Sequence, residues 1–162
     1  MSRLEKTLYY ANQQTLNGSI YVWGGQGEKV KSLTVKQLAR MENSPANAGR
    51  VEAHIKSTLD KIQSKAKCFD CSGLVICALI YGGVLPTGYD NTAAGLYKEF
   101  EKSKLSDLQA GDLVYRENET GSIIHVGIAL DPETIIEARG RDYGIVKTKF
   151  NETWDRANRP KY

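Results

Sequence analysis

The stretch Cys68–Ile80 joins two thiols to a long apolar run, a combination typical of a nucleophilic cysteine at the start of a helix. Its first half is polar, and its second half is almost wholly apolar. We expect a loop that runs into a buried helix, because a surface helix would interrupt the apolar run with polar positions. Gly82-Gly83 should end this helix, since glycine is common directly after a helix.

Cys71 is the thiol that we place at the first turn of this helix. Its neighbours Asp70 and Ser72 are residue types that favour helix starts. Unpaired backbone N–H groups and the positive end of the helix dipole stabilise an anion there. We therefore expect the pKa of Cys71 to be lowered, as a nucleophilic thiolate requires.

A thiolate nucleophile needs a base that takes its proton, and histidine is suited to this because it titrates near neutral pH. The chain holds only His54 and His125. His125 lies in the apolar, strand-like segment Ile123–Ile128, where Gly127 leaves room for another group to approach. Taken alone, this segment also fits a core histidine. His54 lies on a polar predicted helix, and we expect it to be an ordinary surface residue.

Glu137 is the residue that we expect to orient the imidazole of His125. It lies in the next predicted strand, Thr134–Ala138, and antiparallel pairing of the two strands can bring the side chains together. The alternative is that Glu137 only faces solvent.

Cys68 and Cys71 form a C-x-x-C pair, the spacing of a redox couple or of half a zinc site. No second such pair and no matching pair of histidines follows, so we expect neither a metal nor a cofactor. No strand of a βαβ unit is predicted before the pair, which argues against thioredoxin-like chemistry. We interpret Cys68 as an incidental or a regulatory thiol.

The order of predicted elements indicates an α+β domain. Helices are expected at residues 3–17, as a pair within 33–66, and after the cap Asn91-Thr92. Four short strands then follow, at 112–116, 123–130, 134–138 and 143–148. We therefore expect an antiparallel sheet packed on the central helix, followed by a polar tail in which Trp154 is the one buried-type anchor.

Length and charge exclude several classes of protein. A chain of 162 residues fits one domain, and a net charge of +3 is far from the dense basic surface of a nucleic-acid-binding protein. Three cysteines without a disulfide-like spacing indicate reduced thiols. No apolar run reaches membrane-spanning length, and Met1–Lys6 has no apolar leader. We expect a protein made as a soluble cytoplasmic chain, or one exported by a route that the sequence does not show.

Four ordered motifs resemble those of NlpC-type cell-wall cysteine peptidases. They are Y-V-W-G-G at 21–25, D-C-S-G-L-V at 70–75, L-Q-A-G-D-L-V at 108–114 and H-V-G-I at 125–128, and the resemblance runs from about Tyr21 to Thr148. It implies a single papain-like domain over residues 1–162, with N-terminal helices and a catalytic helix packed on an antiparallel sheet. It also implies hydrolysis of peptidoglycan stem peptides at the bond between D-isoglutamate and the following diamino acid. From the charge and the lack of a long apolar run, we expect neither a nucleic-acid partner nor membrane insertion.

Matched by position, the resemblance implies a role for each motif residue. Cys71 would be the nucleophile and His125 its base. Tyr21 would lie near the oxyanion, and the backbone N–H of Cys71 would complete the oxyanion hole. Asp70 and Ser72 would hold the amino end of the stem peptide.

Two departures from the family pattern leave alternatives open. The third polar residue of the family is usually histidine, sometimes asparagine or glutamine, whereas Glu137 stands here. Cys-His-Glu is also similar to CHAP-type amidases, so an N-acetylmuramoyl-L-alanine amidase is one alternative, and a cell-wall-binding module that has lost activity is another. The stretch from Gln26 to Phe69 replaces a short loop, which implies a helical insertion at about 28–66. The segment Ile135–Lys149 resembles phage-encoded members, which implies an endolysin or a tail-associated enzyme that reaches the wall by phage-mediated release.

Overall fold

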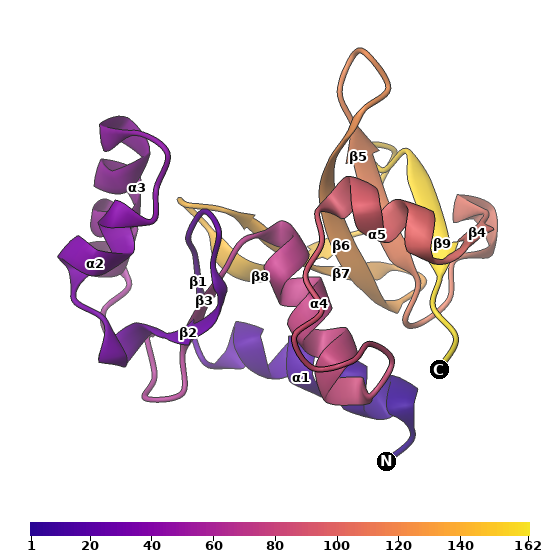
Figure 1. Ribbon diagram of the computed structural model, residues 1–162, viewed down its shortest axis with the longest axis horizontal. Coiled ribbons are helices and arrows are strands. Elements are labelled where there is room, and N and C mark those ends of the chain that lie inside the picture. The colour runs from indigo at the N-terminus through magenta and orange to yellow at the C-terminus, as the bar shows by residue number, and fades with distance from the viewer.

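The computed structural model describes all 162 residues, and Figure 1 shows its helices and strands. The helices are α1 (Arg3–Leu16), α2 (Val35–Arg40), α3 (Pro45–Ser57), α4 (Cys71–Gly82) and α5 (Ala93–Glu99). The strands are β1 (Ile20–Tyr21), β2 (Gln26–Lys29), β3 (Lys67–Phe69), β4 (Glu101–Ser103), β5 (Leu113–Glu117), β6 (Ile123–Asp131), β7 (Thr134–Gly140), β8 (Gly144–Lys149) and β9 (Arg156–Arg159). No helix combines the length and the apolar character needed to cross a bilayer.

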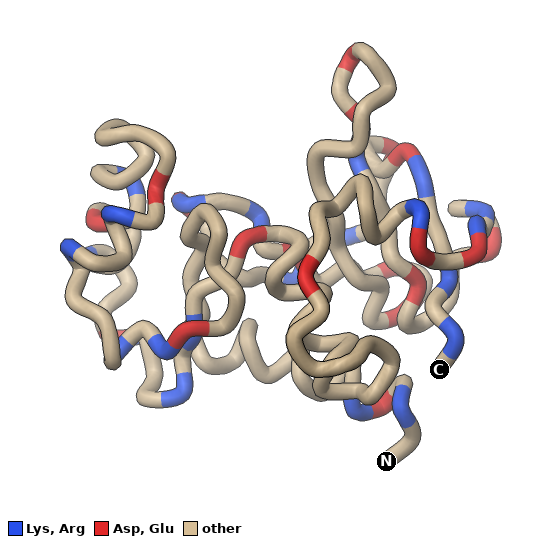
Figure 2. Tube along the Cα trace, in the orientation of Figure 1, with Lys and Arg blue, Asp and Glu red and all other residues tan.

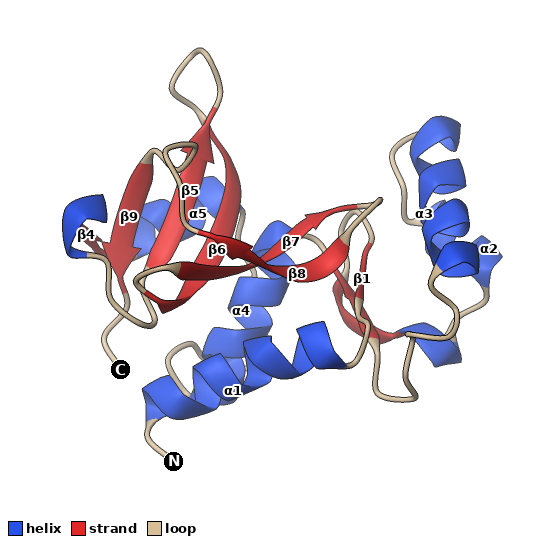
Figure 3. Ribbon diagram, turned by 180° about the vertical axis from the view of Figure 1, so that it is seen from behind, coloured by secondary structure: helices blue, strands red, loops and turns tan.

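A six-stranded antiparallel sheet in the order β4-β9-β5-β6-β7-β8 forms the larger layer. Helices α4 and α5 pack against β6, and α1 packs against α4 (Figure 3). The four strands predicted between residues 112 and 148 are β5 to β8, and the predicted α+β class with a helix on an antiparallel sheet is confirmed.

Two short strands correct the sequence analysis. Lys67–Phe69, expected as part of a loop before the central helix, is strand β3, which pairs parallel to β1 and antiparallel to β2. Arg156–Arg159, expected as a polar tail, is strand β9, which lies between β4 and β5. Such short segments have no readable hydrophobic period of their own, and distant partner strands stabilise them.

Helices α2 and α3 fall in the region where a polar helical pair was predicted, and they lie at the end of the molecule opposite the six-stranded sheet (Figure 1). Thr34 and Gln37 form a capping box at the start of α2, and Ser44 caps α3 with Pro45 at its first position. Helix α3 ends at Ser57, so residues 58–66 of the region predicted to hold the helical pair lie outside both helices. A small separate core joins these helices to β1 and β3; its members are Ile20, Val22, Val30, Leu38, Val51, Ile55, Ile62, Ala66 and Cys68.

The central helix α4 is buried because it is apolar on nearly all sides. Asp70 caps its start, and Gly83 ends it in the left-handed conformation that glycine adopts without strain. Leu74, Val75 and Leu79 are fully buried in the main core, which also holds residues of β5, β6 and β7. The helix therefore presents its first turn at a fixed place beside the sheet.

Charged residues of both signs are interspersed along the chain, without a continuous basic stripe (Figure 2). This distribution agrees with the mild net charge of +3.

Two glycines let the loop after β1 touch the first turn of α4. A Cβ atom at Gly73 would lie 2.1 Å from the carbonyl oxygen of Gly25, and a Cβ atom at Gly25 would lie 2.8 Å from the backbone nitrogen of Phe69. Both distances are shorter than any contact that real side chains make, so larger residues would separate the two segments.

We predict that Gly73→Ala lowers the free energy of unfolding by about 1–3 kcal/mol, because the added methyl group overpacks a backbone contact. Gly49→Ala is the matched control. Gly49 lies within α3 with open space around its Cα, so alanine should be neutral or should stabilise the helix by up to about 1 kcal/mol. Urea denaturation measures both, and equal effects at the two positions would contradict the proposed contact.

Candidate active site

Cys71 is the first residue of α4, where the sequence places it. The carboxylate of Asp70 caps the helix by accepting the N–H of Gly73 at 2.7 Å, and it also accepts the hydroxyl of Ser72 at 3.2 Å. The backbone of Val126, the residue after His125, lies close enough to the Cys71 thiol to influence its pKa. The helix start therefore lies against the strand that carries His125.

Tyr21 reaches the same place through the small sheet. Strands β1 and β3 are parallel, with Tyr21 opposite Phe69, so both strands end at the same edge of this sheet. Tyr21 is the last residue of β1, and Cys71 follows two residues after the end of β3. Tyr21 is close enough to Cys71 for a thiolate there to raise its pKa further. Burial is the main cause that raises the pKa of Tyr21 to about 12, so its hydroxyl is a protonated donor at neutral pH.

His125 and Glu137 are brought together by the pairing of β6 with β7. Glu137 lies opposite Gly127, so His125 is its diagonal neighbour on the same face of the sheet. The imidazole Nε2 lies 2.7 Å from Glu137 Oε2, a charge-assisted hydrogen-bond distance. With Nε2 bound in this way, Nδ1 is the ring nitrogen left for another partner.

Glu137 is fully buried, so it does not face solvent as one interpretation of the sequence allowed. Burial alone would raise its pKa, but hydrogen bonds from His125 and Thr148 and the electrostatic effects of His125 and Arg116 hold the pKa below its ordinary value. The hydroxyl of Thr148 donates to Oε1 at 2.7 Å, and Arg116 Nη2 lies 3.7 Å from the same oxygen. Glu137 is therefore an anion throughout the neutral range.

Trp154 is a neighbour of His125 that the sequence analysis did not assign to the site. Its ring stacks on the imidazole, with centroids 5.7 Å apart and planes inclined by 22°. A Cβ atom at Gly127 would lie 3.1 Å from the indole, so the lack of a side chain at Gly127 makes room for Trp154. The sequence analysis expected Gly127 to leave such room, without identifying the group that fills it. The guanidinium of Arg116 lies over the Trp154 ring, 4.2 Å from its centroid.

Sequence signals for these additional neighbours were weak. Trp154 was recognisable only as a buried anchor in a polar tail, while Thr148 and Arg116 lie at the ends of predicted strands without any motif. Only the register of the sheet identifies them as neighbours of Glu137 and His125.

The expected lowering of the Cys71 pKa is wrong for the resting structure. Burial raises the pKa of Cys71 to about 11, and the Asp70 carboxylate beside it adds to the rise. Backbone groups of Val126, Ser72 and Cys71 itself oppose the rise without overcoming it. The structure contains no hydrogen bond between this thiol and the imidazole of His125. The resting side chain is therefore a thiol, and it needs a base at the moment of attack.

The other two candidates lie outside this cluster. Cys68 is fully buried in the small core with its Sγ 3.4 Å from Glu28 Oε2, and burial raises its pKa to about 12, so it fits a packing residue better than a regulatory thiol. His54 is half-buried rather than fully exposed, and it lines a separate cavity of about 620 Å³ with Asp142 and Tyr143. None of the predicted site residues lines that cavity.

We predict that iodoacetamide labels Cys71 with a rate that rises through alkaline pH and has its midpoint above pH 9, because the folded environment disfavours the thiolate. Peptide mapping by mass spectrometry reads the three cysteines separately in the unaltered protein. Cys68, which is fully buried, should stay unlabelled and serve as the internal control. A midpoint near or below neutral pH would instead indicate a thiolate–imidazolium pair at rest.

Comparison with solved structures shows the same architecture over nearly the whole chain. The P60 domain of an antigen from M. avium subspecies paratuberculosis superposes with a TM-score of 0.63 at 18% identity, covering 99% of this chain and 96% of that one. RipD from Mycobacterium tuberculosis, described as a non-catalytic NlpC/p60 domain protein adapted to peptidoglycan binding, gives 0.63 at 15% identity, covering 98% of each chain. RipB from the same organism, described as a peptidoglycan hydrolase, gives 0.63 at 20% identity, covering 99% of this chain and 66% of RipB.

At these identities, the likeness concerns the fold, and it confirms the papain-like architecture that the motifs implied. No match was found among curated protein sequences. The family model described as the NlpC/P60 family matches residues 18–158, which include all four motifs and both candidate reacting side chains. The chain therefore belongs to the NlpC/P60 family.

Proposed function

We propose that this protein is a peptidoglycan hydrolase that cleaves stem peptides with Cys71 as nucleophile and His125 as base. The observation that supports this most is the 2.7 Å hydrogen bond between His125 and the buried carboxylate of Glu137, beside the helix start that carries Cys71. Thiol acyl transfer requires an oriented imidazole near the thiol, and here the strand that carries His125 lies against the helix start through the backbone of Val126. The bond that we propose is the one between D-isoglutamate and the following diamino acid, as in the peptidases that the motifs resemble.

In the first step, the Cys71 sulfur attacks the carbonyl carbon of the scissile peptide bond. Because the resting thiol is protonated, its proton passes to Nδ1 of His125 as the carbon–sulfur bond forms. The imidazolium produced in this way lies against the Glu137 anion, which stabilises its charge and holds the ring in one orientation. Glu137 thus acts by stabilising the protonated base.

The tetrahedral intermediate carries a negative oxygen that needs preorganised donors. The backbone N–H of Cys71 is one of the unpaired donors at the helix start, and the protonated hydroxyl of Tyr21 lies near the thiol. Together they would form the oxyanion hole. Collapse of the intermediate breaks the carbon–nitrogen bond, and the imidazolium gives its proton to the departing amine. Water, deprotonated by His125, then attacks the thioester and releases Cys71.

Asp70 and Ser72 are proposed to contact the free amino end of the stem peptide. Asp70 already accepts three hydrogen bonds, from Gly73, Ser72 and the N–H of Gly24 at 3.1 Å. A carboxylate has about four lone-pair sites, so it can accept one more donor while it caps the helix. An Asp70 variant would therefore lose both the cap and the substrate contact.

Two alternatives use the same fold. RipD is described as a non-catalytic peptidoglycan-binding protein, so a binding role is the first alternative; the intact pairing of His125 with Glu137 beside Cys71 favours hydrolysis over it. The second alternative is an N-acetylmuramoyl-L-alanine amidase, because the Cys-His-Glu order of this chain is similar to that of CHAP-type amidases. Mass spectrometry of muropeptides after digestion separates the three functions, since the new termini identify the bond that was cut.

We propose that the protein acts on the cell wall and reaches it by phage-mediated release.

We predict that Cys71→Ala abolishes release of cleaved muropeptides while the circular dichroism spectrum stays unchanged, because no neighbouring group can replace the attacking sulfur. Cys77→Ser is the matched control. Cys77 lies two turns further along the same helix, outside the site, and its loss should leave most activity intact. Full activity in Cys71→Ala would exclude this nucleophile, and equal loss in both variants would point to a general effect on α4.

A graded loss of activity is expected at Glu137. Glu137→Gln keeps an acceptor for His125 but removes the charge, so kcat should fall, and the acidic side of its pH profile should move to lower pH because the imidazolium loses a neighbouring anion. Glu137→Ala should fall further, since the ring then loses its orienting partner as well. Rates near wild type for both variants, in protein shown to be folded, would remove Glu137 from the mechanism.

A further inference from the structure

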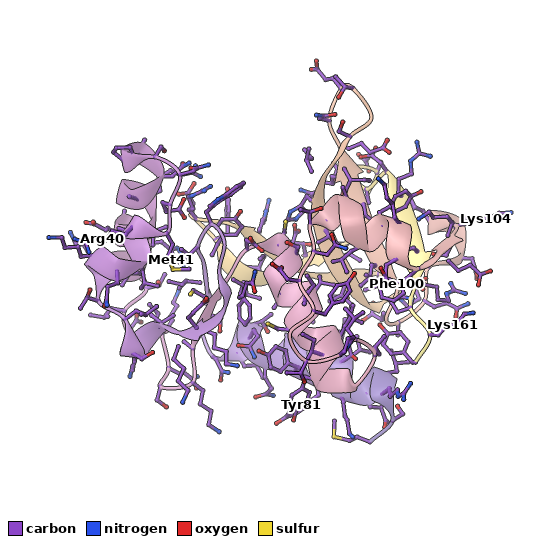
Figure 4. The ribbon with its side chains drawn as sticks, viewed as in Figure 1. Arg40, Met41, Tyr81, Phe100, Lys104 and Lys161 are labelled. Atoms are coloured by element: carbon purple, nitrogen blue, oxygen red, sulfur yellow. The ribbon has the colours of Figure 1, made fainter.

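We propose that Glu42, in the helical segment 28–66, is a positioning residue that holds two walls of the active site in place and acts on the reaction through Tyr21. This inference rests on the proposed hydrolase function and adds a residue that lies in none of the four motifs. Glu42 follows Arg40 and Met41, which are labelled at the end of α2 in Figure 4.

The carboxylate of Glu42 binds two segments that are distant from it in sequence. Its Oε1 accepts the backbone N–H of Trp23 at 2.9 Å, and its Oε2 accepts Nε of Arg141 at 2.8 Å. Trp23 belongs to the Y-V-W-G-G loop, and Arg141 lies in the turn between β7 and β8. One carboxylate therefore joins the helical segment, the loop after β1 and the tip of the hairpin that carries Glu137.

Arg141 connects this link to Tyr21. Its guanidinium lies over the Tyr21 ring, 5.2 Å from the ring centroid, within the range of a cation–π contact. Arg141 Nη2 lies 2.6 Å from Glu42 Oε2, so the guanidinium is held on one side by the carboxylate and on the other by the aromatic ring. Tyr21 therefore has the Glu42–Arg141 pair behind it and the Cys71 thiol near it.

Burial makes this link strong. The Glu42 side chain has no exposed surface, and that of Arg141 is 13% exposed, so solvent screens their attraction little. A buried charge that loses its partner is costly, which favours one fixed geometry for all three groups. Burial is the main cause that raises the pKa of Tyr21; the positive charge of Arg141 lowers this pKa, and the Glu42 carboxylate raises it, so the pair acts on Tyr21 chiefly through its position.

A second ion pair between the same segments provides a matched control. Arg50 of α3 contacts Asp142 in the same β7–β8 turn, through two hydrogen bonds that include Nε to Oδ1 at 3.0 Å. Both side chains are about half exposed, at 49% and 50%, and the hydrogen bonds of Arg50 go to Asp142 and Asn47, not to Tyr21 or Trp23. Exposed pairs of this kind contribute little to stability. Arg50→Ala thus removes a link between the helical segment and the hairpin and keeps the groups that form both hydrogen bonds of the Glu42 carboxylate.

The first test is a double-mutant cycle on muropeptide cleavage with Glu42→Gln and Tyr21→Phe. We expect Glu42→Gln to lower kcat roughly tenfold with little change in KM, less than the ~100-fold or more typical of a lost oxyanion donor. In the Tyr21→Phe background, the same change should cost little further, because the hydroxyl through which Glu42 acts is gone. Arg50→Ala should keep wild-type kcat. Additive losses, or an equal loss in Arg50→Ala, would overturn the inference.

The second test needs no catalysis and measures hydrogen exchange at the Trp23 amide by NMR. Glu42→Gln and Glu42→Ala should speed this exchange, with the larger effect in alanine, while Arg50→Ala should leave it unchanged. Unchanged exchange in both Glu42 variants would show that Glu42 does not hold the loop and would overturn the inference. A wild-type protein that cleaves no muropeptide would refute the hydrolase proposal, and the exchange measurement would still decide whether Glu42 fixes the loop.

Discussion

The carboxylate of Asp70 is the constraint on which the site depends. It caps α4 through the N–H of Gly73, and its second oxygen accepts the N–H of Gly24 in the loop after β1. In return, the N–H of Asp70 donates to the carbonyl of Gly25 at 3.0 Å. The first turn of α4 and the loop that follows Tyr21 are thus fixed to each other, and Cys71 and Tyr21 gain a defined separation without any direct bond between them.

A buried negative charge organises the facing sheet in a similar way. Glu137 is surrounded by a histidine, a threonine and an arginine, which come from strands β6, β8 and β5 respectively. Such a group is stable only when its partners satisfy it, so its geometry resists small movements of the strands. Because Trp154 also stacks on the imidazole, the orientation of His125 is fixed both at its edge and across its face.

Local features of the chain were predictable where the signal lay within a few residues. The caps of α4, the capping box of α2 and the strands from β5 to β8 follow from residue type and period, and the pairing of His125 with Glu137 follows from two adjacent strands. What depends on distant packing was not predictable. The helix start favours a thiolate at Cys71, but the walls that bury it come from other elements and raise its pKa instead. Likewise, β9 and the approach of Trp154 need partners far along the chain.

The place of β9 in the sheet affects the order in which the molecule can assemble. It is the last strand of the chain, yet it lies between β4 and β5, in the interior of the sheet. During synthesis from the N-terminus, the thiol helix and the strand with His125 leave the ribosome before this strand and before Trp154 just ahead of it. Until they arrive, β5 has an open edge and the imidazole has one bare face. The surroundings of His125 are therefore complete only after the segment from Trp154 to Arg159 has emerged and β9 has paired with β5.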